Sequence, residues 1–399
     1  MRSGWLLLLA PCALGCDSGP YTLGREVSGS SGAPAPLPWF GGPDYYADWP
    51  RGFPTEPSYF PIGVWMQNPI NAARFAAVGV NHYLGLWEGP TEEQLRGARE
   101  ADMPVVCEQQ GVWRENLEER QIRGWLMQDG PDNAQELEDG SYGPCIPPSE
   151  TAVRYQEMVA ADPSRPVVVL LGQGVAMPDW VGRGECTGRT EDYLGYAASA
   201  DILVNYTYPL ANKHPIELVA TGIQNLNEYA RFRKPVFADI EASSIHGLPR
   251  PTPHQLRAEV WMSLIHGAAG VQYFCHRMEP LNETDCLDDA ETAAALTRIN
   301  RELAQLAPVL NTQSYALEPR SNNAAVPVRA VLKRQGAERH VFAASMADGA
   351  TSATFDLDGL GRGARVEVLG EDRDVVATEG AFQDDFAPYD VHLYRIAAP

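Results

Sequence analysis

Eight short apolar segments alternate with amphipathic segments between residues 61 and 276, and this alternation restricts the fold more than any other feature of the chain. The apolar segments are residues 61–67, 80–87, 104–110, 124–129, 166–172, 201–209, 235–243 and 270–276. Helical patterns lie between them, among others at residues 91–100, 149–161, 215–230 and 253–268. Near-continuous apolar strands that are separated by helices indicate a parallel sheet with both faces covered.

Eight strand–helix repeats within about 250 residues predict an α/β fold of the (β/α)8, or TIM barrel, type. A doubly wound open sheet is the alternative, but it usually has fewer strands, and no GxGxxG turn follows the first segment. We therefore expect the barrel to span residues 58–312, ending with a helix at 292–310.

The pattern changes after this helix. Short alternating segments separated by Gly and Asp turns predict a small antiparallel β-sandwich domain over residues 313–399. We expect this domain to pack against the barrel, and sugar binding is an alternative role for it.

The N-terminus, MRSGWLLLLAPCALGC, has a basic start, an apolar run and small residues before a cysteine. It resembles a bacterial lipoprotein signal, which implies that residues 1–15 are removed and that Cys16 carries a lipid anchor in the membrane. The protein would then be exported to the cell envelope or cell surface; a plain secretory signal is the alternative. Residues 16–57 are rich in Gly, Ser and Pro and are expected to form a tether.

Charge excludes one class of partner. The chain has 52 acidic and 31 basic residues, giving a formal net charge of -21. Because such a surface repels phosphate backbones, we expect no nucleic-acid partner, and neutral or cationic substrates fit better. No CxxC or HxH pattern is present, so the sequence supports no metal site.

Seven cysteines are present, and five remain once Cys12 and Cys16 are set aside as parts of the signal. Export favours disulfides. The pairs Cys145/Cys186 and Cys275/Cys286 both join loop-like regions, although spacing alone does not define connectivity. Cys107 lies in a strand segment and is expected to be a buried thiol.

Polar and aromatic side chains gather where the predicted strands end. Since an active site on this fold is built at the carboxyl ends of the strands, these residues are candidates for substrate binding. They are Trp65, Gln67, His82, Trp87, Glu88, Glu108, Asp129, Asp132, Asn133, Tyr206, Tyr208, Asp239, Glu241, Tyr273 and His276. Aromatic rings stack on the C–H face of a sugar, while acids and amides bind its hydroxyls, so a carbohydrate ligand is expected.

Four stretches resemble the superfamily of (β/α)8 glycoside hydrolases that includes β-galactosidase-like and cellulase-like enzymes. They are FPIGVW in the first strand, DGPDNAQ after the fourth, KPVFADIEAS at the seventh and HGAAGVQYFCH at the eighth. The resemblance covers about residues 61–310. It implies hydrolysis of glycosidic bonds in an oligo- or polysaccharide, and carboxylates suffice for this chemistry without a cofactor or metal.

The resemblance also implies a retaining mechanism with one carboxylic acid after strand four and one after strand seven. One attacks the anomeric carbon while the other protonates the leaving oxygen, and the two groups lie about 5 Å apart. Glu241 matches the nucleophile after strand seven; the alternative is a buried ion-pair partner.

Gly130 occupies the position after strand four where relatives carry the acid/base glutamate, and it cannot supply a proton. Three explanations are open. In the first, Asp129 or Asp132 transfers the proton. In the second, Glu108 or Glu88 reaches the leaving group. In the third, hydrolysis has been lost. The leading hypothesis is a lipid-anchored glycosidase, and the alternative is a non-catalytic glycan-binding lipoprotein.

Overall fold

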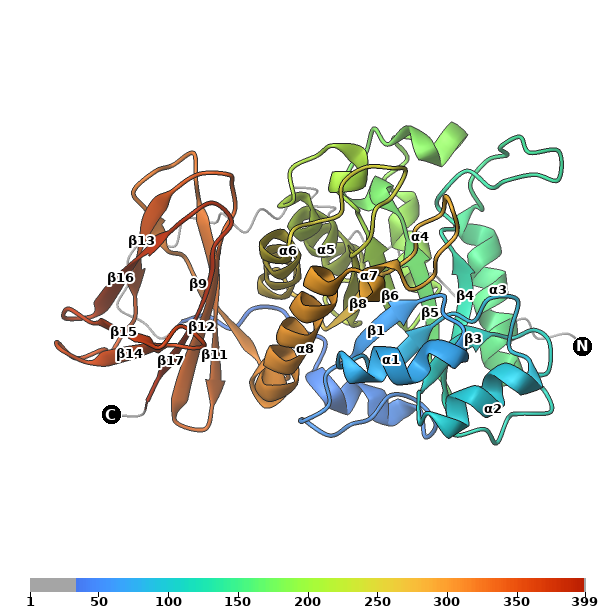
Figure 1. Ribbon diagram of the computed structural model, residues 1–399, viewed down its shortest axis with the longest axis horizontal. Helices are drawn as coiled ribbons and strands as arrows, with labels where there is room; N and C mark the ends of the chain where they lie inside the picture. The colour runs from blue at the N-terminus through green and yellow to red at the C-terminus, as the bar shows by residue number, and fades with distance from the viewer. Residues whose placement is uncertain (1–33, 398–399) are drawn as a thin grey trace, which may run out of the picture. The chain divides into compact units, whose positions relative to one another are not determined.

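The computed structural model describes residues 34–397, which form a closed barrel followed by an antiparallel β-domain (Figure 1). The predicted signal 1–15, the predicted lipid site Cys16 and residues 17–33 of the predicted tether lie outside the described residues. Within residues 34–397, no helix combines the length and apolar character needed to cross a membrane.

Eight parallel strands close the barrel and follow one another in chain order. They are β1 (Ile62–Trp65), β2 (His82–Leu84), β3 (Val105–Glu108), β4 (Ile122–Asp129), β5 (Val167–Leu171), β6 (Ile202–Tyr206), β7 (Val236–Glu241) and β8 (Gly270–Phe274). Closure occurs where β8 pairs with β1, with Val271 opposite Ile62. Each strand overlaps one of the eight predicted segments, and the predicted TIM barrel is confirmed.

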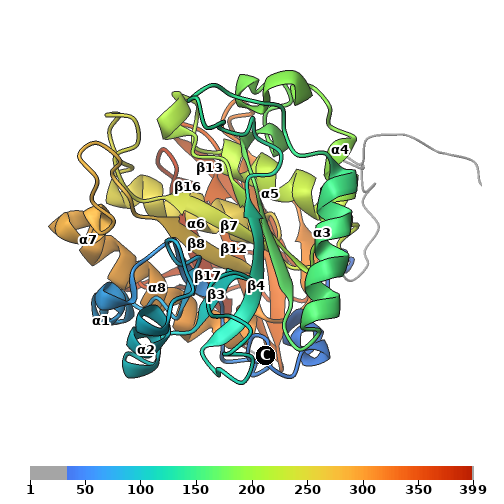
Figure 2. The ribbon, with the colours of Figure 1, turned by 90° about the vertical axis from the view of Figure 1, so that its right-hand side faces the viewer.

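Helices surround the barrel (Figure 2). They are α1 (Ala72–Ala77), α2 (Glu92–Glu100), α3 (Pro148–Ala161), α4 (Asp192–Ala198), α5 (Leu218–Tyr229), α6 (Pro253–Ile265), α7 (Asp285–Asp288) and α8 (Ala290–Leu310), with short 3-10 turns η1 (Gly42–Asp48), η2 (Pro69–Asn71), η3 (Gln173–Val175), η4 (Val181–Cys186) and η5 (Leu210–Asn212). Capping boxes at Thr91 and Thr252 fix where α2 and α6 begin, because each hydroxyl accepts a backbone N–H of the first turn.

The N-terminal part of the described chain differs from the predicted tether. Residues 34–57 are part of the fold: residues 35–37 bond to β9 (Ser314–Leu317) of the β-domain, while Tyr46 of η1 and Phe53 are each 3% exposed and pack with the residues that fill the barrel interior. The Phe53 ring lies 5.2 Å from the ring of His82 and 6.0 Å from that of Phe237. The Gly and Pro content of this segment suggested a tether, but its aromatic residues supply enough apolar surface to close the barrel at the amino ends of the strands.

The β-domain is a sandwich of two sheets, as predicted. One sheet has the order β15-β14-β17-β12-β11-β9 and the other β10-β13-β16. The strands are β9 (Ser314–Leu317), β10 (Arg320–Ser321), β11 (Val328–Gln335), β12 (Glu338–Ser345), β13 (Thr351–Asp356), β14 (Arg365–Val368), β15 (Arg373–Val376), β16 (Ala381–Phe386) and β17 (Val391–Ile396).

Successive residues of β12 enter two different cores. Val341 and Ala343 pack inside the sandwich, whereas Phe342 packs against the barrel helices, with its ring 5.0 Å from that of Trp261 on α6. Because side chains alternate along a strand, the larger sheet is covered on both faces here.

Two disulfides tie loops at the barrel. Cys145–Cys186 joins the loop after β4 to η4, and Cys275–Cys286 closes the segment after β8. The sequence suggested these two pairs because both join loop-like regions, although it did not determine the connectivity. Cys107 on β3 is buried and, within the described residues, has no sulfur partner.

Replacing Phe53 by Ala tests whether the N-terminal segment is part of the fold. Loss of this buried ring should reduce the free energy of unfolding by about 3–5 kcal/mol. Urea unfolding followed by tryptophan fluorescence measures the change, and Phe53→Leu should lose much less. A substitution without effect would show that the segment does not contribute to the core.

Candidate functional site

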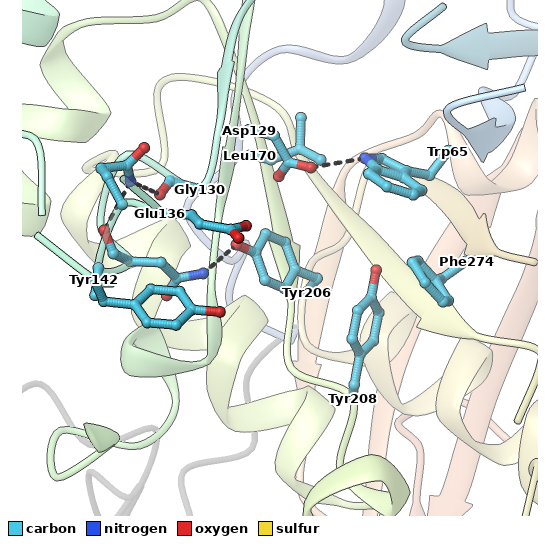
Figure 3. A pocket seen from close by; sticks show the side chains of 12 residues that line it. Trp65, Asp129, Gly130, Glu136, Tyr142, Leu170, Tyr206, Tyr208 and Phe274 are labelled. Carbon is cyan, nitrogen blue, oxygen red and sulfur yellow. Dashed lines mark hydrogen bonds between the residues drawn. The ribbon is translucent and has the colours of Figure 1, made fainter. Parts of the chain in front are cut away.

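A cavity of about 390 Å³ opens where β1, β4, β6 and β8 end (Figure 3). Trp65, Asp129, Gly130, Asn133, Ala134, Gln135, Glu136, Tyr142, Leu170, Tyr206, Tyr208 and Phe274 line it. Adjacent rings form one wall: Trp65 stacks on Phe274 at 5.2 Å, Phe274 lies 5.2 Å from Tyr208, and Tyr208 lies 5.4 Å from Tyr206. The volume suits a small ligand such as one or two sugar rings.

Asp129 ends β4 and brings a carboxyl into this cavity. The indole N–H of Trp65 donates to its Oδ2 over 3.0 Å. Burial raises the pKa of Asp129 to about 6, the Trp65 hydrogen bond acts in the opposite direction, and the negative charges of Asp132 and Glu108 raise it further. A carboxyl with such a pKa holds a proton in mildly acidic solution, as a general acid must.

Asp239 on β7 lies beside the same wall. The Tyr208 hydroxyl donates to Asp239 Oδ2 over 2.9 Å, and Asp239 Oδ1 is buried without a hydrogen-bond partner in the described structure. Burial raises the pKa of Asp239 to about 8, and the charge of Asp129 contributes to the rise. The negative charge of Asp129 thus disfavours ionisation of Asp239, which makes the two carboxyls a candidate coupled pair.

The loop between β4 and α3 forms the opposite wall. The Asn133 amide donates to the Tyr206 hydroxyl over 2.6 Å, and the Gln135 amide donates to the carbonyls of Gly130 and Asn133. Glu136 pairs with Tyr142 through a β-bridge, which brings both side chains to the cavity (Figure 3).

Gly130 is required by the geometry of this loop. Its φ of +55° lies in the left-handed region, and a Cβ added here would collide with the Tyr206 hydroxyl. A glutamate at this position, where the resemblance leads one to expect the acid/base, is therefore excluded unless Tyr206 and the loop move.

Asp132 anchors the loop and does not line the cavity. It is fully buried; its carboxylate accepts the Gly172 N–H over 3.0 Å and the Tyr193 hydroxyl over 2.8 Å. The side chain that was a candidate for proton transfer is thus turned toward the protein interior, where it satisfies a backbone donor that β5 leaves unpaired.

Glu241, the predicted nucleophile, also lies outside the cavity lining. It is 1% exposed, and its two carboxylate oxygens accept the N–H groups of Leu210 (2.6 Å) and Ala211 (3.0 Å) at the start of η5. Burial raises its pKa to about 7, and these hydrogen bonds oppose the rise. The structure brings Asp129, but not Glu241, to the cavity surface.

Three further candidates face the interior, which corrects their assignment to the substrate. Gln67 donates to the Glu283 carbonyl, His82 lies inside the barrel beside the Gln272 amide, and the Tyr273 hydroxyl donates to Asn300 of α8. All three are 0% exposed. For Tyr273 the error is one of strand register: neighbouring residues point to opposite faces, and Phe274 faces the cavity instead.

The remaining four candidates do not line the cavity. Trp87 is 58% exposed, Glu88 is exposed, and Glu108 is half-buried near enough to Asp129 to raise its pKa. The buried His276 ring lies 5.0 Å from that of Trp65, and burial lowers its pKa to about 4, so it is neutral above that pH. Trp65, Asp129, Asn133, Tyr206 and Tyr208 are the predicted residues that the structure brings together.

Sequence reasoning missed six cavity residues: Gln135, Glu136, Tyr142, Phe274, Ala134 and Leu170. The first three belong to a loop that folds back over the barrel, and no strand-end rule locates such residues. The only group of potential metal ligands within residues 34–397 is Cys145, Cys186 and Asp192, and there the two sulfurs are bonded to each other.

Solved structures share the fold at very low sequence identity. A single-residue variant of AmyP in complex with maltotriose aligns with a TM-score of 0.54 and 10% identity, covering 86% of this chain and 98% of that one. An Anoxybacillus α-amylase described as a new glycosyl hydrolase subclass gives 0.50 and 9%, covering 86% and 99%. The α-amylase of Geobacillus thermoleovorans with acarbose gives 0.51 and 10%, covering 85% and 98%. The chain has a glycoside hydrolase-like fold.

This likeness concerns the fold alone, since identities near one in ten do not carry residue roles. No family model matches the sequence, and no curated protein matches it significantly.

Replacing Asp239 by Asn tests the pKa of this buried acid. The folded protein keeps the Asp239 proton up to about pH 8, whereas an unfolded aspartate loses it near pH 4, so wild-type stability should fall as pH rises through this window. Asn mimics the protonated acid, and the variant should be more stable than wild type at pH 8 by roughly 2–5 kcal/mol, with little difference at pH 4.

Urea unfolding at several pH values measures this difference. Asp179→Asn, a substitution of an exposed aspartate between η3 and η4, serves as the control and should follow wild type. Parallel pH curves for wild type and Asp239→Asn would contradict the raised pKa.

Proposed function

We propose that this protein is a glycoside hydrolase that cleaves an oligo- or polysaccharide at the cavity on the barrel rim. The observation that carries the proposal is the position of Asp129. It places a carboxyl with a raised pKa beside a wall of aromatic rings, at the end of β4 in a glycosidase-type barrel. The rings supply stacking surfaces for a sugar, and Asp129 supplies the proton for the leaving oxygen.

Two carboxyls compete for the second catalytic role. In a retaining mechanism Glu241 is the nucleophile, which requires η5 to move off its carboxylate because Leu210 and Ala211 now occupy both oxygens. Asp239 is the competitor, since it lies on the same strand and its ionisation is coupled to that of Asp129. Tyr208, which donates to Asp239, has a φ of 45°, a strained conformation for this residue type.

Hydrolysis should depend on Asp129. With a panel of chromogenic glycosides and polysaccharides, Asp129→Asn should lower kcat/KM by at least about a hundredfold, because the variant has no proton to donate. Wild-type activity should fall as pH rises through about 6, where Asp129 ionises. Asp179→Asn is the matched control and should retain activity.

The same assay separates the two second carboxyls. If Glu241→Gln loses turnover and Asp239→Asn remains active, the result supports the retaining mechanism with Glu241 as the nucleophile. If Asp239→Asn loses turnover and Glu241→Gln remains active, Asp239 is the second catalytic carboxyl. Turnover that persists in Asp129→Asn would refute the acid role.

A non-catalytic glycan-binding protein is the second candidate function. Two observations favour it: Gly130 stands where the resemblance implies an acid/base glutamate, and Glu241 is closed off by η5. Sugar-dependent thermal shifts in the absence of turnover across the panel would support this candidate over hydrolysis.

We also propose that the protein is exported and lipid-anchored through Cys16, on the basis of the N-terminal sequence. The disulfides Cys145–Cys186 and Cys275–Cys286 agree with an oxidising compartment. Cys16→Ser should abolish labelling by a radioactive fatty acid and move the protein from the detergent to the aqueous phase in a partition assay, whereas Cys12→Ser should leave both unchanged. Labelling that survives in Cys16→Ser would refute the anchor.

A further inference from the structure

The cavity offers free carboxylate oxygens, and its free side-chain hydroxyl donors are those of Tyr142 and Tyr206. The N–H groups of Trp65, Asn133 and Gln135 each donate to a protein acceptor, and the Tyr208 hydroxyl donates to Asp239. By contrast, the carboxylate oxygens of Glu136 and Oδ1 of Asp129 accept no hydrogen bond from the described residues. A ligand that fits this surface must bring donors of its own.

The charge of the lining has a single sign. Asp129 and Glu136 are its ionisable carboxylates, and none of the described lining residues is Lys, Arg or His. Glu136 is exposed and forms no ion pair with any basic side chain of residues 34–397. The nearby His276 adds no positive charge at neutral pH, because burial lowers its pKa to about 4.

Aromatic rings between these carboxylates strengthen the preference for a cation. Tyr142 and Tyr206 line the side of the cavity near Glu136, while Trp65 lies beside Asp129 (Figure 3). The faces of such rings attract ammonium groups as well as sugar C–H groups. The net charge of -21 favours the approach of positively charged ligands from solution.

We propose that the cavity selects glycans that carry a protonated amine, such as oligosaccharides of glucosamine, and that the Glu136 carboxylate receives the ammonium group. This inference rests on the proposed glycan site and names its substrate class. An ammonium group has three donors and no acceptor, which complements the carboxylate oxygens of Glu136 and the free oxygen of Asp129. Uronic acids and sulfated sugars would place like charges against these carboxylates.

Isothermal titration of the full-length protein with four tetrasaccharides tests the proposal. The sugars are glucosamine, N-acetylglucosamine, glucose and galacturonic acid tetramers, at mildly acidic pH where the free amine is protonated. The glucosamine tetramer should bind about tenfold more tightly than the neutral tetramers, salt should weaken only this interaction, and the galacturonic acid tetramer should bind least.

Glu136 variants sharpen the test. Glu136→Gln should remove most of the preference for glucosamine, and Glu136→Lys should shift it toward galacturonic acid. Glu138→Gln and Glu138→Lys change an exposed glutamate of the same loop that does not line the cavity, and they should behave as wild type. Thermal unfolding of each variant verifies that it is folded.

Chromatography of the reaction products measures cleavage separately from binding. The preference for glucosamine and the glycosidase activity are therefore tested independently. Binding or cleavage of neutral tetramers as strong as that of the glucosamine tetramer overturns the inference and leaves the proposed glycosidase intact. Equal effects of the Glu136 and Glu138 variants overturn it as well. Absence of binding and of cleavage for all four sugars overturns both.

Discussion

Closure of the barrel between β8 and β1 is the constraint on which the rest of the structure depends. Because all eight strands are parallel, their carboxyl ends meet at one rim, and residues distant in sequence become neighbours there. Trp65 donates to Asp129, and Phe274 stacks on Trp65, although β1 and β8 lie at opposite ends of the barrel sequence. An open sheet of the same strands would keep β1 and β8 apart and leave no such wall.

Two acids on this rim serve the backbone. Asp132 accepts the Gly172 N–H, and Glu241 accepts two N–H groups at the start of η5. A buried N–H without a partner is unfavourable by about 1–3 kcal/mol, so a carboxylate within reach becomes part of the loop that it satisfies. This use of acids fixes the loops after β4 and β6 and leaves Asp129 and Glu136 as the carboxyls that line the cavity.

The eight strands could be predicted from the sequence because parallel barrel strands are buried on both faces and therefore read as apolar runs. The two-sheet domain could be predicted from its alternating segments. The sequence could not predict which of two neighbouring side chains faces the cavity. Tyr273 contacts α8 while Phe274 lines the cavity, and shifting a strand by one residue exchanges them.

Long-range packing explains the other differences from prediction. Phe53 enters the barrel from a segment with the composition of a linker, and composition does not reveal the apolar surface that receives it. Glu136 and Tyr142 reach the cavity because the loop after β4 folds back through a β-bridge and is joined to η4 by Cys145–Cys186. The packing of Phe53 and the Cys145–Cys186 disulfide join residues far apart in sequence, whereas periodicity reports only local structure.

The alternation along β12 has a consequence for how the two domains can be separated. Phe342 belongs to the interior that α6 shares with the larger sheet, while Val341 and Ala343 belong to the sandwich. A protein that ended after α8 would contain every cavity residue, yet it would expose the Trp261 surface to water. The end of α8 separates the two domains along the chain, but the shared interior couples their unfolding. The barrel and the sandwich should therefore unfold in one cooperative transition.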